Sequence, residues 1–186
     1  MTSSRIAAIF PSSLREDRPL PGGIEEQYDD LEVPATIQLN DIIDALEMQF
    51  DESFSYLDLD AGKVVTVSEN LLREAEEPGD EEPDLPDWQK GEWEIAKRIV
   101  STDRFRPLPT KFEVHEWGIM QEFSGSVESE SISAELSRAI HGAGAFRIFK
   151  DTVRRLGIES AWFAFRAGAL RQIALDWCEE NQIAWE

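Results

Sequence analysis

The chain has 186 residues and a formal net charge of −20, with six tryptophans, ten phenylalanines and a single cysteine, Cys178. This aromatic content is atypical of a disordered acidic protein, and one cysteine excludes an internal disulfide and a thiolate metal cluster. The length suits one domain with added irregular segments, and the lone cysteine fits the reducing cytoplasm.

The negative charge is concentrated in residues 1–103, whereas residues 104–171 hold slightly more basic than acidic residues. An acidic front repels nucleic-acid phosphates and anionic membranes, so nucleic acid is disfavoured as a partner. The apolar run Ile6–Phe10 is broken by Pro11 and is too short for a signal-peptide core or a membrane span. We therefore expect a cytoplasmic protein without a membrane segment, whose partner, if it has one, is another protein.

A leader over residues 1–36 mixes Ser, Pro, Gly and acids without sustained periodicity, which predicts a disordered or loosely packed segment. Residues 39–50 then predict a helix capped by Asn40 or Asp41. Its inner face is expected to hold Ile42, Ile43, Leu46 and Phe50.

Residues 53–69, "SFSYLDLDAGKVVTVSE", contain two β-prone runs joined by Asp60 to Lys63, which predicts a β-hairpin. Gly62 can adopt the positive φ that a tight reversal needs. Asp58 and Asp60 are interpreted as turn residues, because the closing glutamate of a calcium-binding EF-hand loop is absent at the required spacing.

Prolines and acids at about residues 74–86 predict an exposed acidic loop, followed by a helix over residues 87–100 that is capped by Asp87. The segment "RFRPLP", Arg104 to Pro109, must be largely extended, because proline disfavours the α region for the preceding residue. The inner stripe of the 87–100 helix is expected to hold Trp88, Ile95, Ala96, Ile99 and Val100.

The remaining residues predict helices. One helix runs over residues 111–123, although Gly118 weakens its middle. A short helix ended by Gly142 follows, and then a helix over residues 145–156 ended by Gly157. The last helix begins at about Ser160. The stripe of the first is expected to hold Val114, Trp117, Met120 and Phe123, and that of the last Phe163, Ala167, Leu170, Ala174 and Trp177. Residues 37–186 thus predict one α+β domain, mostly helical, with an N-terminal β-hairpin, which the "RFRPLP" segment can extend, and a C-terminal helical bundle.

No catalytic signature is present in the sequence. His115 and Glu116 stand in "HEWGI", but Ile119 occupies the position where a zinc-protease helix has its second histidine, so no metal site is predicted. "FSGSV" lacks the pattern of a serine nucleophile, and no cofactor motif is recognised. His115 and Glu116 remain only as an acid/base pair in the catalytic alternative.

The stretch "HGAGAFRIFK" places two glycines before a helix whose first turns carry Arg147 and Lys150. Such a corner either lets two helices reverse direction or offers free N–H groups to a phosphate. It has neither the Walker nor the Rossmann spacing, so the structural interpretation is preferred. The candidate anion-binding residues are Arg104, Arg106, Arg147, Lys150 and Arg166.

The segment "GAFRIFKDTVRRLGIESAWFAFRAGALRQIALDW", Gly144 to Trp177, resembles the C-terminal signature of an uncharacterised bacterial protein family of unknown function (UPF type). "SYLDLDAGKVV", "RFRPLPTKFEVHEWGIMQEF" and "LSRAIHGAGAFRIFK" are similar to earlier segments of that family in the same order. The resemblance covers roughly residues 39–184. It implies one intact domain and brings no activity.

These observations favour a cytoplasmic, non-enzymatic binding or regulatory module without a cofactor. The alternative is an enzyme acting on a phosphorylated or nucleic-acid substrate, with the arginines and lysine as anion holders and His115 as acid or base. A third interpretation, in which the acidic front mimics nucleic acid, requires ordered rows of carboxylates. A concave pocket that contains His115, Arg147 and Arg166 would favour the enzyme.

Overall fold

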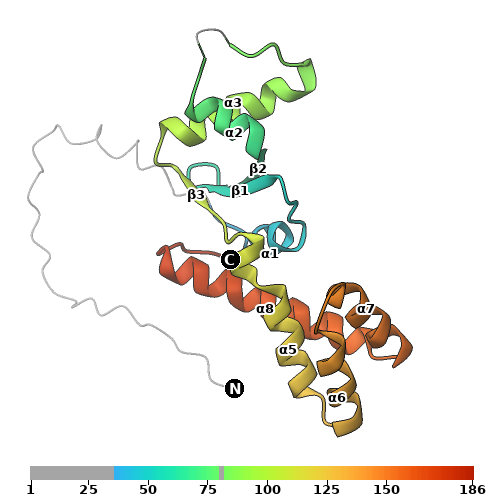
Figure 1. Cartoon of the computed structure of the whole chain (residues 1–186). Coiled ribbons are helices and arrows are strands. Elements are labelled where there is room, and N and C mark those ends of the chain that lie inside the picture. The colour runs from blue at the N-terminus through green and yellow to red at the C-terminus, as the bar shows by residue number, and fades with distance from the viewer. Residues whose placement is uncertain (1–35, 80–81) are drawn as a thin grey trace, which may run out of the picture. The chain divides into compact units, whose positions relative to one another are not determined.

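A three-stranded antiparallel sheet forms the centre of the fold (Figure 1). The computed structural model describes residues 36–79 and 82–186. Strand β1 (Ser53–Asp58) pairs with β2 (Lys63–Ser68) on one side and with β3 (Phe105–Pro107) on the other. The predicted hairpin is confirmed, and the extended "RFRPLP" segment supplies the third strand.

The hairpin turn is held by the Asp58 carboxylate. Its Oδ1 accepts the backbone N–H of Asp60 at 3.1 Å and that of Ala61 at 3.2 Å. Gly62 takes φ +63°, the left-handed conformation that glycine adopts without steric cost. The turn interpretation of the two aspartates therefore agrees with the hydrogen bonds that they make.

The two faces of the sheet contribute to two different hydrophobic clusters, because successive side chains of a strand point to opposite faces. Tyr56 and Val67 belong to the smaller cluster, with α2 (Glu69–Glu76) and α3 (Asp87–Ser101). Leu57 belongs to the larger cluster. The other members of that cluster come largely from helices that precede β3 in the sequence and from helices that follow it. The sheet thus lies between two packed layers.

Three expectations for α2 and α3 need correction. The helix α2 extends to Glu76, so the first residues of the expected acidic loop are helical. Trp88 and Val100 are exposed, at 76% and 40%, whereas Trp93 is buried against α2. The helix begins at Asp87 itself and its N-cap is Pro86, since proline pre-sets a helix-compatible φ without needing a donor.

Helix α1 (Leu39–Glu47) packs its apolar face into the larger cluster through Leu39, Ile42 and Leu46. Its N-cap is Gln38, not Asn40 or Asp41. The helix ends before Phe50, whose side chain is exposed rather than part of the inner face. The periodic pattern of apolar residues continues for about one turn beyond the end of the helix.

Helices α5 (Glu116–Ser126), α6 (Glu130–Ala139), α7 (Ala145–Arg155) and α8 (Glu159–Glu180) form the predicted C-terminal bundle. Their common core is aromatic. Phe123 lies 5.3 Å from Trp162 and 6.3 Å from Phe149 between ring centroids, and Phe149 lies 4.9 Å from Trp162 in an edge-to-face arrangement. Such pairs add to the stabilisation from burial alone.

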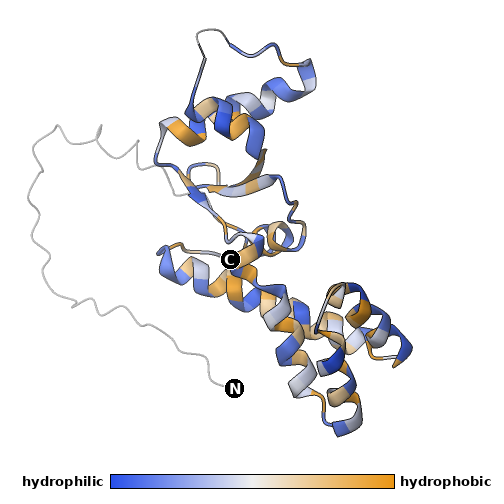
Figure 2. Cartoon of the chain, viewed as in Figure 1, coloured by the Kyte–Doolittle hydropathy of each residue, from blue (hydrophilic) through white to orange (hydrophobic). Residues whose placement is uncertain are grey.

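Helix α8 contacts α1, α5 and α7, so it needs apolar side chains on several sides and not one stripe. Hydrophobic and hydrophilic residues accordingly alternate along it in Figure 2. The expected stripe is only half correct: Leu170, Ala174 and Trp177 are buried, whereas Phe163 and Ala167 are exposed. The buried aromatic at the start of the helix is Trp162.

The helix predicted over residues 111–123 is interrupted. Helix α4 (Lys111–Val114) ends at His115, which has φ +49° in the left-handed region, and α5 starts at the next residue. Glycine is the residue that usually accepts this conformation, so its adoption by histidine reflects constraints from both helices.

Glycines follow the ends of α6 and α7, as predicted. Gly142 and Gly144 take φ +85° and +76° in the corner between α6 and α7, and Gly157 takes +69° after α7. The N–H of Ile158 then donates to the Val153 carbonyl at 3.1 Å, which closes the end of α7.

The last residues return to the start of the described chain. Ile37 forms a β-bridge with Trp185, and the N–H of Glu186 donates to the Ile37 carbonyl at 3.0 Å. The described residues, 36–79 and 82–186, belong to one compact unit, so the fold is a single α+β domain. The expected leader over residues 1–36 lies, but for its last residue, outside the described residues. No helix over residues 36–79 and 82–186 is both long and apolar enough to cross a membrane.

Candidate functional site

The predicted anion-binding residues do not gather at one place. Arg104 is held at the hairpin, where its Nε lies 3.0 Å from Asp58 Oδ1 and its Nη1 3.0 Å from Asp60 Oδ2. Arg106 donates to the Asp103 carbonyl at 3.1 Å on the surface. Neither arginine lines the hollow that contains Lys150 and Arg166.

Arg166 is only 20% exposed and is bound by two carboxylates from other helices. Its Nε donates to Glu116 Oε1 at 2.9 Å and its Nη1 to Glu47 Oε1 at 3.1 Å. The guanidinium thus links α8 to α5 and α1. Because two acids already neutralise it, Arg166 is poorly suited to hold an additional anion.

A hollow of about 440 Å³, the Arg166 pocket, collects part of the predicted set. Lys150 lies on its wall with its Nζ 5.0 Å from the Phe146 ring centroid, a cation–π contact. The structure thus brings Glu116, Lys150 and Arg166 together, but His115 and Arg147 are not among the lining residues. The pocket is lined by Glu47, Gln49, Lys111, Glu116, Phe146, Lys150, Trp162, Phe163 and Arg166.

His115 belongs to a small aromatic row on the surface. Its ring centroid lies 5.9 Å from that of Trp117, which lies 6.5 Å from that of His141. The indole N–H of Trp117 donates to the Ile140 carbonyl at 2.9 Å, which ties α5 to the end of α6. Within the described residues no group of three or more His, Cys, Asp or Glu is placed to hold a metal ion.

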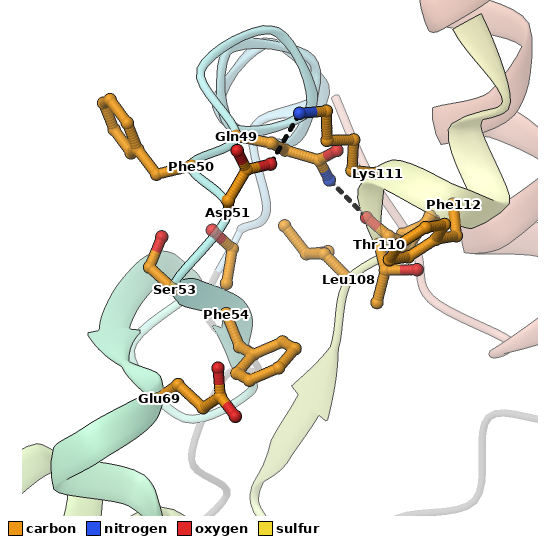
Figure 3. A pocket seen from close by; sticks show the side chains of 12 residues that line it. Gln49, Phe50, Asp51, Ser53, Phe54, Glu69, Leu108, Thr110, Lys111 and Phe112 are labelled. Carbon is orange, nitrogen blue, oxygen red and sulfur yellow. Dashed lines mark hydrogen bonds and ion pairs between the residues drawn. The ribbon is translucent and has the colours of Figure 1, made fainter.

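A second hollow, of about 230 Å³, is walled by three exposed phenylalanines and is called the phenylalanine pocket (Figure 3). Phe50 follows α1, Phe54 lies on β1 and Phe112 lies on α4. Their exposed fractions are 71%, 37% and 91%. Exposing such rings to water costs free energy that a bound apolar partner would recover.

Polar contacts fasten the two walls of the phenylalanine pocket to each other. Gln49 Nε2 donates to the Pro109 carbonyl, and Lys111 Nζ lies 2.6 Å from Asp51 Oδ1 (Figure 3). These contacts connect the loop after α1 with the segment that leads into α4. The exposed rings therefore project from segments that these contacts hold in a fixed conformation.

The short helix α4 is fixed at its own start by a capping box. The N–H of Thr110 donates to Glu113 Oε2 at 2.7 Å, and Thr110 Oγ1 accepts the N–H of Glu113. Two hydrogen bonds from Thr110 to the Glu113 carboxylate hold the pKa of Glu113 below its ordinary value. The larger effect comes from the backbone N–H of Thr110 and the smaller from its hydroxyl group. A helix of one turn would otherwise be marginal, so the box holds Phe112 in place.

A third hollow, of about 400 Å³, lies between α1 and β2 and is called the α1–β2 groove. Asp41, Asp44 and Met48 line it from α1, and Lys63 from the start of β2. It shares Phe50 with the phenylalanine pocket, which in turn shares Lys111 with the Arg166 pocket. The three hollows are therefore neighbours. The exposed apolar side chains along them, here called the aromatic face, are Met48, Phe50, Phe54, Phe112, Phe146 and Phe163.

Sequence reasoning missed most of the aromatic face. The sequence pattern places Phe50 and Phe163 on inner stripes, and the predictions include neither Phe54 nor Phe112. A signal did exist for Phe112, which is off the three-residue spacing of Val114 and its successors and lies inside the Thr-x-x-Glu capping pattern of Thr110 to Glu113. An apolar residue placed there cannot face the same core.

The model of an uncharacterised protein family, UPF0158, matches residues 32–186. A UPF0158 protein of Pseudomonas aeruginosa is 31% identical over 151 residues, which cover 81% of this chain and 86% of that protein. No solved structure matches the chain.

Proposed function

Since the chain belongs to the UPF0158 family, whose description carries no activity, we propose from its geometry that it is a non-enzymatic module that docks another protein on the aromatic face. The observation that carries the proposal is the phenylalanine pocket: Phe50, Phe54 and Phe112 surround one hollow while remaining exposed. Aromatic side chains on exposed, rigid positions are the residues that dominate protein interfaces.

The openness of the pocket supports a protein partner over a small molecule. Sites for small ligands enclose most of the ligand surface. A ring such as Phe112, at 91% exposure, projects from the surface and does not enclose anything. It would instead enter a depression of a partner, while the hollow between Phe50 and Phe54 would receive a partner side chain.

Pre-organisation supports the same proposal. The Lys111–Asp51 ion pair and the Gln49 hydrogen bond are present in the unliganded chain, so the loops that carry the rings need little ordering on binding. Loop ordering is one of the main costs of association, and a fixed surface avoids it.

The enzyme alternative receives less support. The hypothesis required His115, Arg147 and Arg166 in one concave pocket, and only Arg166 lines the Arg166 pocket. Glu116, the other acid/base candidate, is engaged by Arg166 at 2.9 Å.

We further propose that the docking takes place in the cytoplasm, in keeping with a single, buried, free cysteine.

Photocrosslinking tests the proposal. A photoreactive phenylalanine analogue at position 112 should give a discrete protein adduct in bacterial cells. The same analogue at Trp88, an equally prominent exposed aromatic on α3, serves as the matched control and should not give it. Phe50→Ser should abolish the adduct at position 112 without lowering the melting temperature, since Phe50 is exposed. Equal adducts at positions 88 and 112, or indifference to Phe50→Ser, would contradict the proposal.

A further inference from the structure

We infer that the segment that docks on the aromatic face is basic as well as apolar. The inference rests on the proposed function and adds the chemistry of the partner. It starts from the charges that border the apolar side chains, because complementary charge around an apolar centre sets the choice of partner and the rate of encounter.

The α1–β2 groove carries carboxylates directly beside its apolar side chains. Asp41 and Asp44 are exposed on α1 and, over the described residues, have no cationic group within ion-pair distance. Met48 lies one turn further along the same side of the chain, at 67% exposure. A partner residue with an aliphatic stem and a cationic head would cover Met48 and reach either aspartate.

The cations of the same surface are fewer than the acids, and two of the four are in ion pairs. Lys111 is paired with Asp51, and Arg166 with Glu47 and Glu116. Lys63 lines the α1–β2 groove and Lys150 packs on Phe146; each has no carboxylate within ion-pair distance among the described residues. The acids that line the three hollows outnumber the bases: Asp41, Asp44, Glu47, Asp51, Glu69 and Glu116 against Lys63, Lys111, Lys150 and Arg166.

The charge of the whole chain acts in the same direction. A formal charge of −20 accelerates the approach of a cationic partner and slows that of an acidic one. It also opposes the approach of a second copy of this chain. The surface is therefore suited to a segment that alternates apolar residues with Lys or Arg.

Three synthetic peptides of equal length test the inference: one built from Leu and Lys, one from Leu and Gln, and one from Leu and Glu. Their affinity for the full chain is measured by fluorescence anisotropy at low and at physiological salt. The Leu–Lys peptide should bind at least about tenfold more tightly than the Leu–Glu peptide, and its advantage should shrink with salt.

Matched variants locate the effect. Asp41→Asn with Asp44→Asn should weaken the Leu–Lys peptide about three- to tenfold. Glu128→Gln with Glu130→Gln, exposed acids outside the three hollows, makes the same change of net charge and should alter affinity less than about twofold. Phe50→Ser with Phe112→Ser should weaken binding about tenfold or more.

Different results would contradict the basic partner and the docking surface itself. Equal binding of the Leu–Lys and Leu–Gln peptides, still dependent on Phe50 and Phe112, would overturn the basic partner and leave the docking surface intact. A dimer in sedimentation velocity that Phe112→Ser disperses would also overturn it, because the occupant would then be a second copy. Peptide binding that is absent, or insensitive to both phenylalanines, would overturn the docking proposal itself.

Discussion

The imidazole of His115 occupies the space beside Gly118: a Cβ atom built on Gly118 would lie 2.8 Å from His115 Nδ1. This contact explains a glycine inside α5 that the helical pattern alone does not account for. Gly→Ala inside a helix ordinarily stabilises by about 0.5 to 1 kcal/mol. In this chain Gly118→Ala should instead destabilise by about 1 kcal/mol, because the ring must move away.

A double-mutant cycle in urea checks the origin of that cost. His115→Gly removes the ring and suits the left-handed φ, so Gly118→Ala in that background should regain its ordinary stabilisation. The expected coupling between the two positions is about 1 kcal/mol or more. Additive effects would show that the ring does not restrict residue 118.

The junction at His115 also shows where prediction from sequence stops. The predicted stripe of Val114, Trp117, Met120 and Phe123 is correct for three of its members, which are in the larger cluster, and wrong for Trp117, which is 37% exposed. The spacing cannot show that the helix is interrupted at His115, directly after Val114. The segment that leads into α4 and the first residue of α4 contact the loop after α1, which is about 60 residues away in sequence, and such contacts are not visible in a local pattern.

Local sequence patterns predict a structural feature best where neighbouring residues determine that feature. The hairpin turn and the glycine ends of α6 and α7 depend on neighbouring residues, and they were predicted correctly. Burial on α8 depends on which helices surround it, so the choice between Trp162 and Phe163 could not be made from one stripe. The aromatic face was missed because exposed apolar residues look like core residues in a sequence.

Asp58 should make stability dependent on acid pH. Burial by itself would raise the pKa of Asp58, but the Arg104 guanidinium and the N–H groups of Ala61 and Asp60 outweigh it and hold the pKa below its ordinary value. A group with a depressed folded pKa stabilises above its unfolded pKa, about 3.9 for Asp. This contribution should be lost as pH falls from about 4 towards the folded pKa.

Urea unfolding of Asp58→Asn and of the wild type, compared between pH 7 and pH 3, measures this contribution. Asp58→Asn should cost about 2 to 4 kcal/mol at pH 7, since it leaves Arg104 without its main partner, and less at pH 3. Asp60→Asn, which removes a second and more exposed carboxylate paired with the same Arg104, is the control and should change stability by less than about 1 kcal/mol. A penalty for Asp58→Asn that does not depend on pH would contradict the assignment.

Adjacent aromatic residues on α8 provide a second stability test. Trp162 is 2% exposed and contacts Phe123 and Phe149, whereas Phe163 is 62% exposed. Trp162→Ala should cost about 3 to 5 kcal/mol, and Phe163→Ala should stay within about 0.5 kcal/mol. Comparable losses in thermal unfolding would place Phe163 in the core and remove it from the aromatic face.

Cys178 should be chemically silent in the folded chain. Its side chain is fully buried, and burial raises the pKa of its thiol, so little thiolate is present at neutral pH. An aromatic disulfide reagent should react with the native chain only at the rate of unfolding, and at once in denaturant. Rapid labelling of the native chain would show that α8 opens locally near its C-terminal end.

The corner between α6 and α7 should not bind phosphate specifically. The N–H of Ala145, the first residue of α7, already donates to the Gly142 carbonyl at 3.3 Å, so one of the first-turn donors is engaged within the corner itself. Lys150 rests on Phe146 and does not point alone into solvent. The two glycines thus serve the reversal of the chain.

Melting temperature, measured against phosphate concentration at fixed ionic strength, decides the matter. A ligand that binds only the folded state raises stability in a saturable way, whereas the general effect of salt does not depend on any one side chain. Wild type, Arg147→Ala and Lys150→Ala should therefore shift in parallel. A saturable rise that both substitutions remove would reveal an anion site on α7, and the enzyme hypothesis would then take precedence over the docking module.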